Sequence, residues 1–217
     1  MTASQERYWS HKLADCKAAL ERNNFEVYAV ESPSEARELV VEDILPKLDI
    51  EVVSWGDSMT LYATGLLDYF KNHKRFTVIE TFAPGLSRVD SIPRRRQALL
   101  ADLFLTGTNA VTETGKIVNL DMIGNRVAGL TFGPRHVILM IGRNKVVPDV
   151  KAAMNRVKKL AAPMNAIRHH IKTPCVKTAE CMDCNSPARI CNTWTIHEKS
   201  YPQGRIKVVL INQDLGL

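Results

Sequence analysis

The sequence has 217 residues and a formal net charge of +6. A chain of this length can build a large hydrophobic core that needs no disulfides or metal ions for its stability. Hydrophobic residues make up 45% and charged residues 24%, which excludes a disordered chain, a collagen-like chain and a small disulfide scaffold. No apolar run reaches the roughly 18 residues of a membrane helix. The first residues lead into a polar amphipathic segment, not an apolar signal region. We therefore expect a soluble cytoplasmic protein that makes no contact with membranes.

The positive charge is spread along the chain, apart from a short run of arginines at positions 94–96. Proteins that bind nucleic acids usually carry a denser basic stripe with interleaved aromatic residues. Aromatic residues make up only 6% of this chain. The composition therefore disfavours a nucleic-acid partner and favours a surface that attracts small anions, such as phosphates or carboxylates.

Helix and strand patterns alternate over the first half of the chain. Helices are predicted over residues 5–22, 32–48, 59–72 and 94–100, and strands over residues 25–30, 51–55, 75–80 and 102–106. Cys16 falls on the apolar face of the first helix, so we expect it to be a core residue. The alternation indicates an α/β fold whose mainly parallel sheet has helices on both faces.

The pattern changes over the second half of the chain. Antiparallel hairpin strands are predicted within residues 109–130, and a buried strand over residues 136–141. A helix is predicted to begin at Pro148 and to end at Pro163, and two last strands are expected over residues 193–197 and 206–211. Because no repeat or linker divides the chain, we predict a single domain over residues 1–217 with a cysteine-rich appendage at residues 173–193.

Two turns that follow predicted strands carry candidate anion-binding residues, and ligands of open α/β sheets bind at the carboxyl ends of strands. The first turn offers Gly56, Ser58 and Thr60, with the free N–H groups of the following helix. The alternative there is an ordinary capped turn. The second turn offers Arg143 for a two-point contact and Lys145 as a point charge, with a basic surface turn as the alternative.

Between these turns lies a candidate catalytic carboxylate, Glu113. It is flanked by small polar residues, which is typical of a carboxylate held in a pocket, where it could be a nucleophile or a general base. A solvated hairpin residue is the alternative. The other candidate ligand-binding residues of this region are small or polar: Asn109, Thr112, Gly115, Asn125 and Arg126.

Four of the five cysteines lie close together in the sequence: Cys175, Cys181, Cys184 and Cys191. Four thiolates can complete the ligand set of a zinc ion or of an iron–sulfur cluster. Clustered cysteines in a chain without a secretion signal favour metal over disulfides, and free or oxidised thiols are the alternative. We expect zinc or an iron–sulfur cluster, and the spacing does not separate the two.

Taken together, these motifs resemble the lactate-utilisation (LUD) domain family. The matching segments are residues 98–102, 106–110, 112–115, 124–126 and 142–145. The turn over residues 55–60 also matches, although Asp57 stands where many relatives carry glycine. The cysteine segment resembles a subgroup of standalone family members.

The resemblance implies a fold similar to the NagB/RpiA/CoA-transferase-like proteins and to 5-formyltetrahydrofolate cyclo-ligase. It also implies an accessory role in the oxidation of L-lactate to pyruvate, alongside iron–sulfur oxidoreductase subunits. The resemblance thus implies a pathway and not a catalytic mechanism, so whether the chain is an enzyme stays open. The oligomeric state of the protein stays open as well.

Two other hypotheses remain. Glu113 and Gly115 resemble the Glu-x-Gly turn of CoA transferases, which makes a stand-alone enzyme of the CoA-transferase or cyclo-ligase type one alternative. In that enzyme Glu113 would be the nucleophile or base. The other alternative is a non-catalytic binding module that is stabilised by structural zinc.

Overall fold

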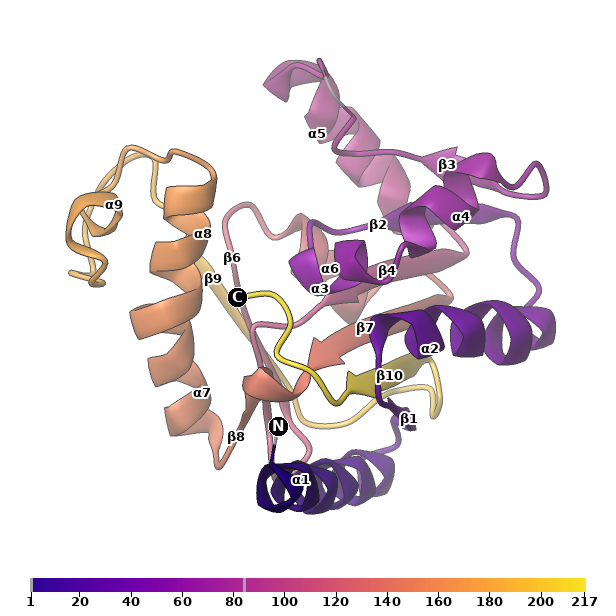
Figure 1. Cartoon of the computed structure of the whole chain (residues 1–217). Helices are drawn as coiled ribbons and strands as arrows, with labels where there is room; N and C mark the ends of the chain where they lie inside the picture. Colours follow the sequence, from indigo (N-terminus) through magenta and orange to yellow (C-terminus); the bar gives the residue numbers. More distant parts are fainter. Residues whose placement is uncertain (1, 84) are drawn as a thin grey trace.

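The computed structural model describes residues 2–83 and 85–217, and a six-stranded parallel sheet forms its centre (Figure 1). The strands in spatial order are β1 (Glu26–Val30), β10 (Ile206–Ile211), β7 (His136–Gly142), β4 (Leu103–Gly107), β2 (Val52–Trp55) and β3 (Thr77–Ile79). Each neighbouring pair is parallel, so the carboxyl ends of the strands share one edge. The predicted α/β architecture is confirmed.

Helices cover both faces of this sheet, because alternate side chains of each buried strand point to opposite faces. On β7, Ile138 and Met140 belong to one hydrophobic cluster, and Val137 and Leu139 belong to the other. The first cluster packs against helices α2 (Pro33–Glu38), α3 (Met59–Ala63) and α4 (Leu66–Asn72) and the helical turns η1 (Leu39–Ile44) and η2 (Leu45–Lys47). The second cluster packs against helices α1 (Ala3–Arg22) and α6 (Asn125–Thr131). Cys16 of α1 is fully buried in this second cluster, as expected.

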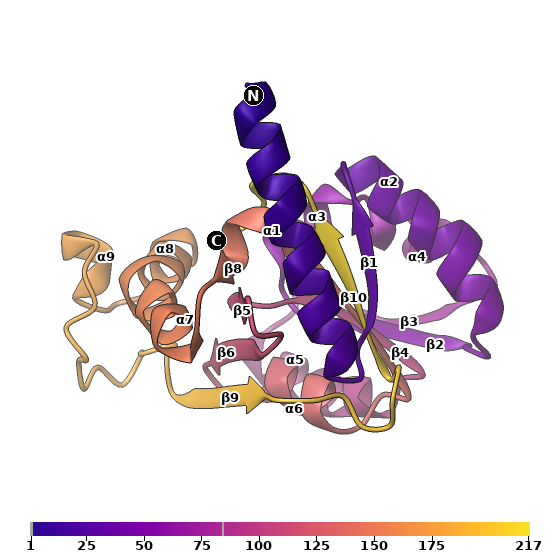
Figure 2. The same cartoon turned by 90° about the horizontal axis from the view of Figure 1, so that it is seen from below.

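A second, four-stranded sheet lies between the large sheet and the last long helices (Figures 1 and 2). Its strands in spatial order are β8 (Val146–Val147), β5 (Ala110–Thr112), β6 (Ile117–Asp121) and β9 (Thr193–His197). The antiparallel pairing of β5 with β6 confirms the predicted hairpin. Helix α7 (Val150–Arg156) packs on this sheet through Ala153, which contacts Ala110 and Val118.

Several predicted boundaries differ from the observed ones. Residues 125–131 form α6 and not a strand. Gly124, with a φ of 86°, is the residue before the helix, and Asp121 Oδ2 accepts the Arg126 backbone N–H of the first turn at 3.2 Å. The helix predicted over residues 59–72 breaks at Gly65, whose φ is 70°. Helix α5 (Arg88–Gln97) begins earlier than predicted, capped by Ser87, and ends in the short turn η3 (Ala98–Leu100).

The prediction that Pro163 ends a helix is wrong. The helix begins at Val150, capped by Asp149, and passes through the π-helical segment η5 (Val157–Ala161) into α8 (Ala162–Arg168). Pro163 lies in the first turn of α8. Because proline lacks an N–H and its ring crowds the preceding turn, a widened π turn before it lets the helix continue.

Between α8 and β9, residues 172–192 form a lobe at the side of the molecule, here called the cysteine lobe (Figure 1). Its regular structure consists of one short helix, α9 (Cys175–Thr178). In the part of the chain that the structure describes, no helix combines the length and the hydropathy needed to cross a membrane.

Candidate functional site

A cavity of about 360 Å³ lies at the carboxyl edge of the large sheet. The turns after β2 and β4 and the start of α6 form one side, and α8 closes the other. Five of the sequence-predicted ligand residues line this cavity: Ser58, Asn109, Asn125, Arg126 and Lys145. The volume lies in the range of small-molecule sites, and the position agrees with the usual ligand site of open α/β sheets.

Lys145 is a buried cation that lines this cavity. It lies in the short turn η4 (Arg143–Lys145) after β7 and is 4% exposed. Its Nζ donates hydrogen bonds to Thr60 Oγ1 at 3.0 Å and to the Thr108 carbonyl at 3.1 Å. Burial, together with the positive charges of Arg156 and Arg126, lowers the pKa of Lys145 to about 7. A buried cation among cations is unfavourable without a counter-ion, so this position favours an anion in the cavity.

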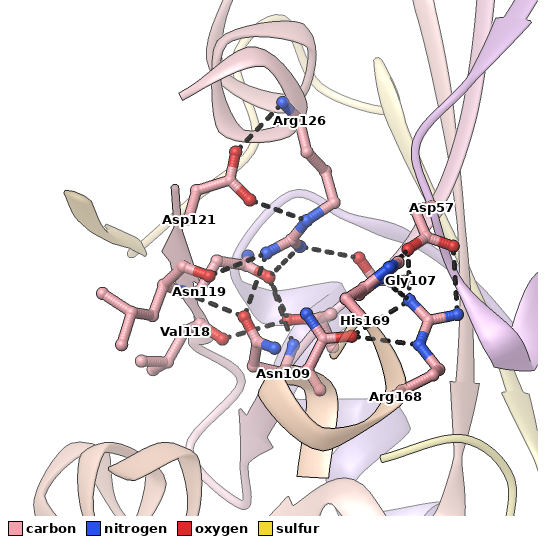
Figure 3. A network of polar contacts seen from close by, with 12 residues as sticks. Asp57, Gly107, Asn109, Val118, Asn119, Asp121, Arg126, Arg168 and His169 are labelled. Carbon is pink, nitrogen blue, oxygen red and sulfur yellow. Dashed lines mark hydrogen bonds and ion pairs between the residues drawn. The ribbon is translucent and has the colours of Figure 1, made fainter. Parts of the chain in front are cut away.

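Arg126 lines the same cavity but is held by the protein (Figure 3). Its guanidinium donates five hydrogen bonds of 2.6–3.2 Å to oxygens of Asp121, Asn119, Asn109, Gly107 and Leu120. These contacts join the turn after β4 to the end of β6. A guanidinium has five N–H donors, so Arg126 adds positive charge to the cavity while its donors are already used.

Asp57 connects the turn after β2 to the end of α8 (Figure 3). Its carboxylate forms an ion pair with Arg168, lies 3.0 Å from His169 Nε2 and accepts a hydrogen bond of 2.8 Å from Tyr62. Burial raises the pKa of Asp57, but the hydrogen bonds from Arg168 and Tyr62 outweigh burial and hold this pKa below its usual value. The contact therefore fixes one wall of the cavity with an ionised carboxylate.

Two glycines allow the turns at this edge to pack closely. A Cβ atom on Gly107 would lie 2.4 Å from Ser58 Oγ. A Cβ atom on Gly56 would lie 2.7 Å from Thr106 Oγ1 and 3.0 Å from Arg126 Cγ. Gly56 is thus placed behind the cavity wall, where it leaves room for Arg126.

The last residues of the chain complete the wall beside Lys145. Thr60 Oγ1 donates to the Leu215 carbonyl at 3.1 Å. Gly216 has a φ of 68°, and a Cβ atom there would lie 2.5 Å from Thr60 Oγ1 and 3.1 Å from Lys145 Nζ. Leu217 lines the cavity. The predicted ligand residue Thr60 therefore holds both Lys145 and this terminal segment in place.

The predicted catalytic residue Glu113 lies away from this cavity. Its carboxylate forms an ion pair of 2.6 Å with Lys12 of α1, and both side chains are about one-third exposed. Thr112 next to it is buried in β5. Gly115 has a φ of 79°, and a Cβ atom there would lie 2.5 Å from the Ala19 backbone, so this turn packs against α1.

The two cations of the predicted anion clamp are separated. Lys145 points into the cavity, whereas Arg143 Nε donates to Asp214 at 2.8 Å. The Arg143 guanidinium lies 5.2 Å from the centre of the Trp9 ring. Residues 143 and 145 of this tight turn thus face different surroundings, and Arg143 holds the terminal segment against α1.

All four clustered cysteines line a second, smaller cavity of about 20 Å³, and all four are free thiols: Cys175, Cys181, Cys184 and Cys191. Over residues 2–83 and 85–217, no three His, Cys, Asp or Glu side chains are already placed to hold a metal ion. The metal site therefore stays a prediction.

Sequence reasoning missed the contribution of α8 to the large cavity. Its residues there are Ala161, Asn165, Arg168 and His169, of which the first directly precedes the helix and the last directly follows it. The available signal was that Arg168 and His169 are adjacent basic residues at the end of a helix. Nothing in the sequence predicts their contact with Asp57, which lies more than 100 positions earlier.

The sequence profile of the LUD domain matches residues 13–211 of this chain. Among solved structures, the chain is similar to a DUF162 family protein from Deinococcus radiodurans, with 16% sequence identity and a TM-score of 0.49. That similarity covers 94% of this chain and 98% of the other. No curated protein matches the chain.

Proposed function

Because the chain belongs to the LUD domain family, we propose that it is an accessory protein of L-lactate utilisation that binds a small anionic metabolite at Lys145. The family supplies the link to lactate, and the cavity at the carboxyl edge of the sheet supplies the candidate site. In this proposal the electrons of lactate oxidation pass to separate iron–sulfur oxidoreductase subunits.

The observation that carries the anion site is the buried position of Lys145. The charged groups that act on its ammonium, Arg156 and Arg126, are both cationic. Two of the three Nζ donors are engaged by Thr60 and Thr108, while the side chain borders the cavity. An anion in contact with Nζ would accept a hydrogen bond from the third N–H of the ammonium. It would also offset the free-energy cost of burying the positive charge.

The other charged side chains that line the cavity also favour an anionic ligand. Among the described residues that line it, four cationic side chains face two carboxylates: Arg95, Arg126, Lys145 and Arg168 against Asp57 and Asp121. Both carboxylates are already paired with arginines of the wall. The cavity thus favours an anionic ligand over a neutral or cationic one.

The test is binding of a panel of anions to the whole chain, measured by calorimetry and by thermal unfolding. The panel contains L-lactate, pyruvate, inorganic phosphate, a nucleoside triphosphate and coenzyme A. We expect L-lactate or pyruvate to bind and to raise the melting temperature. A ligand at 100 times its Kd stabilises a protein by about 2.7 kcal/mol.

The decisive variant is Lys145→Met, which removes the charge and keeps much of the side-chain volume. Lys199→Met makes the same charge change on an exposed residue outside both cavities. We expect Lys145→Met to lose binding and Lys199→Met to keep it. Equal binding by both variants would contradict the site, and binding of phosphate or nucleotide without lactate or pyruvate would contradict the lactate role.

A further inference from the structure

The cysteine lobe has no hydrophobic core of its own. Of residues 172–192, all of which the structure describes, Thr173 is the one buried residue. The secondary structure of the lobe consists of the four-residue helix α9. A segment of this size that buries so little apolar surface needs another source of order, such as a disulfide or a metal ion.

The four lobe thiols border one space. Cys175, Cys181, Cys184 and Cys191 all line the 20 Å³ cavity, although they are spread over 17 residues of sequence. All four are half-buried and free. The four thiols therefore border the same small cavity without pairing as disulfides.

The backbone around these thiols is held by Arg189. Its guanidinium donates to the Cys184 carbonyl at 2.7 Å and to the Cys191 carbonyl at 2.9 Å. Asp183 has a φ of 46°, so the chain turns sharply inside the Cys181–Cys184 pair. Arg189 thus ties the backbone at Cys184 to the backbone at Cys191.

The space between the thiols is small. A free volume of about 20 Å³ holds about one water-sized sphere, which is enough for a single metal ion. Zinc takes four thiolates in a tetrahedron with Zn–S distances of about 2.3 Å. Two cations lie beside the thiols, Lys158 of η5 and Arg189 of the lobe, and both form ion pairs with Asp183. They would offset part of the charge of four thiolates around one zinc ion.

We propose that Cys175, Cys181, Cys184 and Cys191 bind one structural zinc ion that orders the cysteine lobe. On binding, each thiol releases its proton to solvent and its sulfur coordinates the ion, so no electrons are transferred. Since the thiols of the described chain are not yet close enough to form a ligand set, we expect binding to draw them inward around the cavity.

Such a site would also support the wall of the larger cavity. Ala162 and Pro163 of α8 border the thiol cavity, while Asn165 and Arg168 of the same helix border the larger one. Ile190 of the lobe borders both cavities. Ordering of the lobe therefore acts on the helix that closes the large cavity.

The experiment is metal and sulfide analysis of the whole chain, purified without oxygen and without a metal-affinity tag. We expect one zinc per chain, no acid-labile sulfide and no visible absorption. Cys181→Ser and Cys184→Ser should lose most of the zinc, whereas Cys16→Ala, which removes the one thiol outside the lobe, should keep it. Iron in place of zinc, with or without sulfide, or a metal-free chain would overturn the proposal, as would unchanged zinc in both serine variants.

A second measurement on the unmodified chain covers the case in which the serine variants do not fold. Removal of zinc by a strong chelator should speed hydrogen exchange at least tenfold in residues 172–192 while the strands of the large sheet stay protected. Zinc added back should restore the slow exchange. Exchange in the lobe that does not change with chelator and zinc would contradict a structural role.

Discussion

Lys145 and Arg126 carry the same charge into the same cavity, but their surroundings give them different roles. Each donor of the Arg126 guanidinium has a protein oxygen as its partner. Lys145 has two such partners and two cationic neighbours. Arg126 is thus satisfied by the fold itself, whereas the ammonium of Lys145 gains from a ligand that the chain does not provide.

The lowered pKa of Lys145 predicts how stability depends on pH. Lysine in the unfolded chain has a pKa of about 10.4, and folding lowers that of Lys145 to about 7. Between these two values the unfolded state binds more protons than the native state, so raising the pH stabilises the native protein. Below pH 7 both states are protonated and this contribution no longer changes.

Lys145→Met should remove this pH dependence. We expect the variant to be more stable than the natural chain near pH 7, and the difference to shrink as the pH rises towards about 10. Urea unfolding of both proteins over this pH range, without added anions, measures the difference between their free energies of unfolding. A difference that is constant over the range would mean that Lys145 titrates normally.

Glu113 illustrates what a local sequence pattern leaves open. Small polar neighbours predicted a carboxylate in a pocket, but the partner of Glu113 is Lys12, 101 residues earlier. Contacts over such distances depend on how α1 packs on the small sheet, which no local pattern encodes. The role of Glu113 as a nucleophile or base stays a prediction, without support from the larger cavity.

At the scale of elements, α8 depends on its contact with Asp57. We expect Asp57→Asn to weaken the ion pair with Arg168 and the contact with His169, and to destabilise the protein by about 1–2 kcal/mol. Hydrogen exchange should become faster at the C-terminal end of α8. Tyr62→Phe, which removes one hydrogen bond to the same carboxylate and keeps its charge, should have a smaller effect.

The pH dependence of this contact has the same sign as that of Lys145, because both folded pKa values are lowered, but it lies in the acid range. The pKa of Asp57 lies below its usual value, so the stabilising effect of the ionised carboxylate is present above about pH 4 and is lost as the pH falls through the folded pKa.

The hydrogen-exchange measurement on Asp57→Asn also has an outcome that would contradict this role of Asp57. If the amides of α8 exchange at the same rate in the natural chain and in the variant, other contacts hold the helix.

The errors in predicted elements lie at helix boundaries, where features within a few residues outweighed the expected start and stop signals. Pro163 is a standard stop signal, but the π-helical turn before it keeps the axis intact. Residues 125–131 alternate weakly, and Gly124 before them and the carboxylate of Asp121 together support a helix start. The buried strands were predicted well because their continuous apolar runs leave few alternatives.

At the scale of the whole molecule, the sequence predicted the parallel sheet and the sheet edge at which the candidate cavity lies. Parallel strands place their carboxyl ends on one edge, so the turns after β2, β4 and β7 had to meet. The pattern could not show that α8 and residues 215–217 return to this edge and close it. Whether Arg143 or Lys145 enters the cavity was likewise beyond a linear pattern.

The most direct test of the account is the pKa of Lys145 in the whole protein, measured by NMR on lysine labelled with ¹³C and ¹⁵N. The signal is assigned by its absence in Lys145→Met and followed from about pH 5 to about pH 11. We predict a pKa near 7 without anions and a clear rise when pyruvate or L-lactate is added, because a bound anion stabilises the ammonium. A Lys145 that titrates near its ordinary value of about 10.4, and that no anion shifts, would contradict an anion site at this residue.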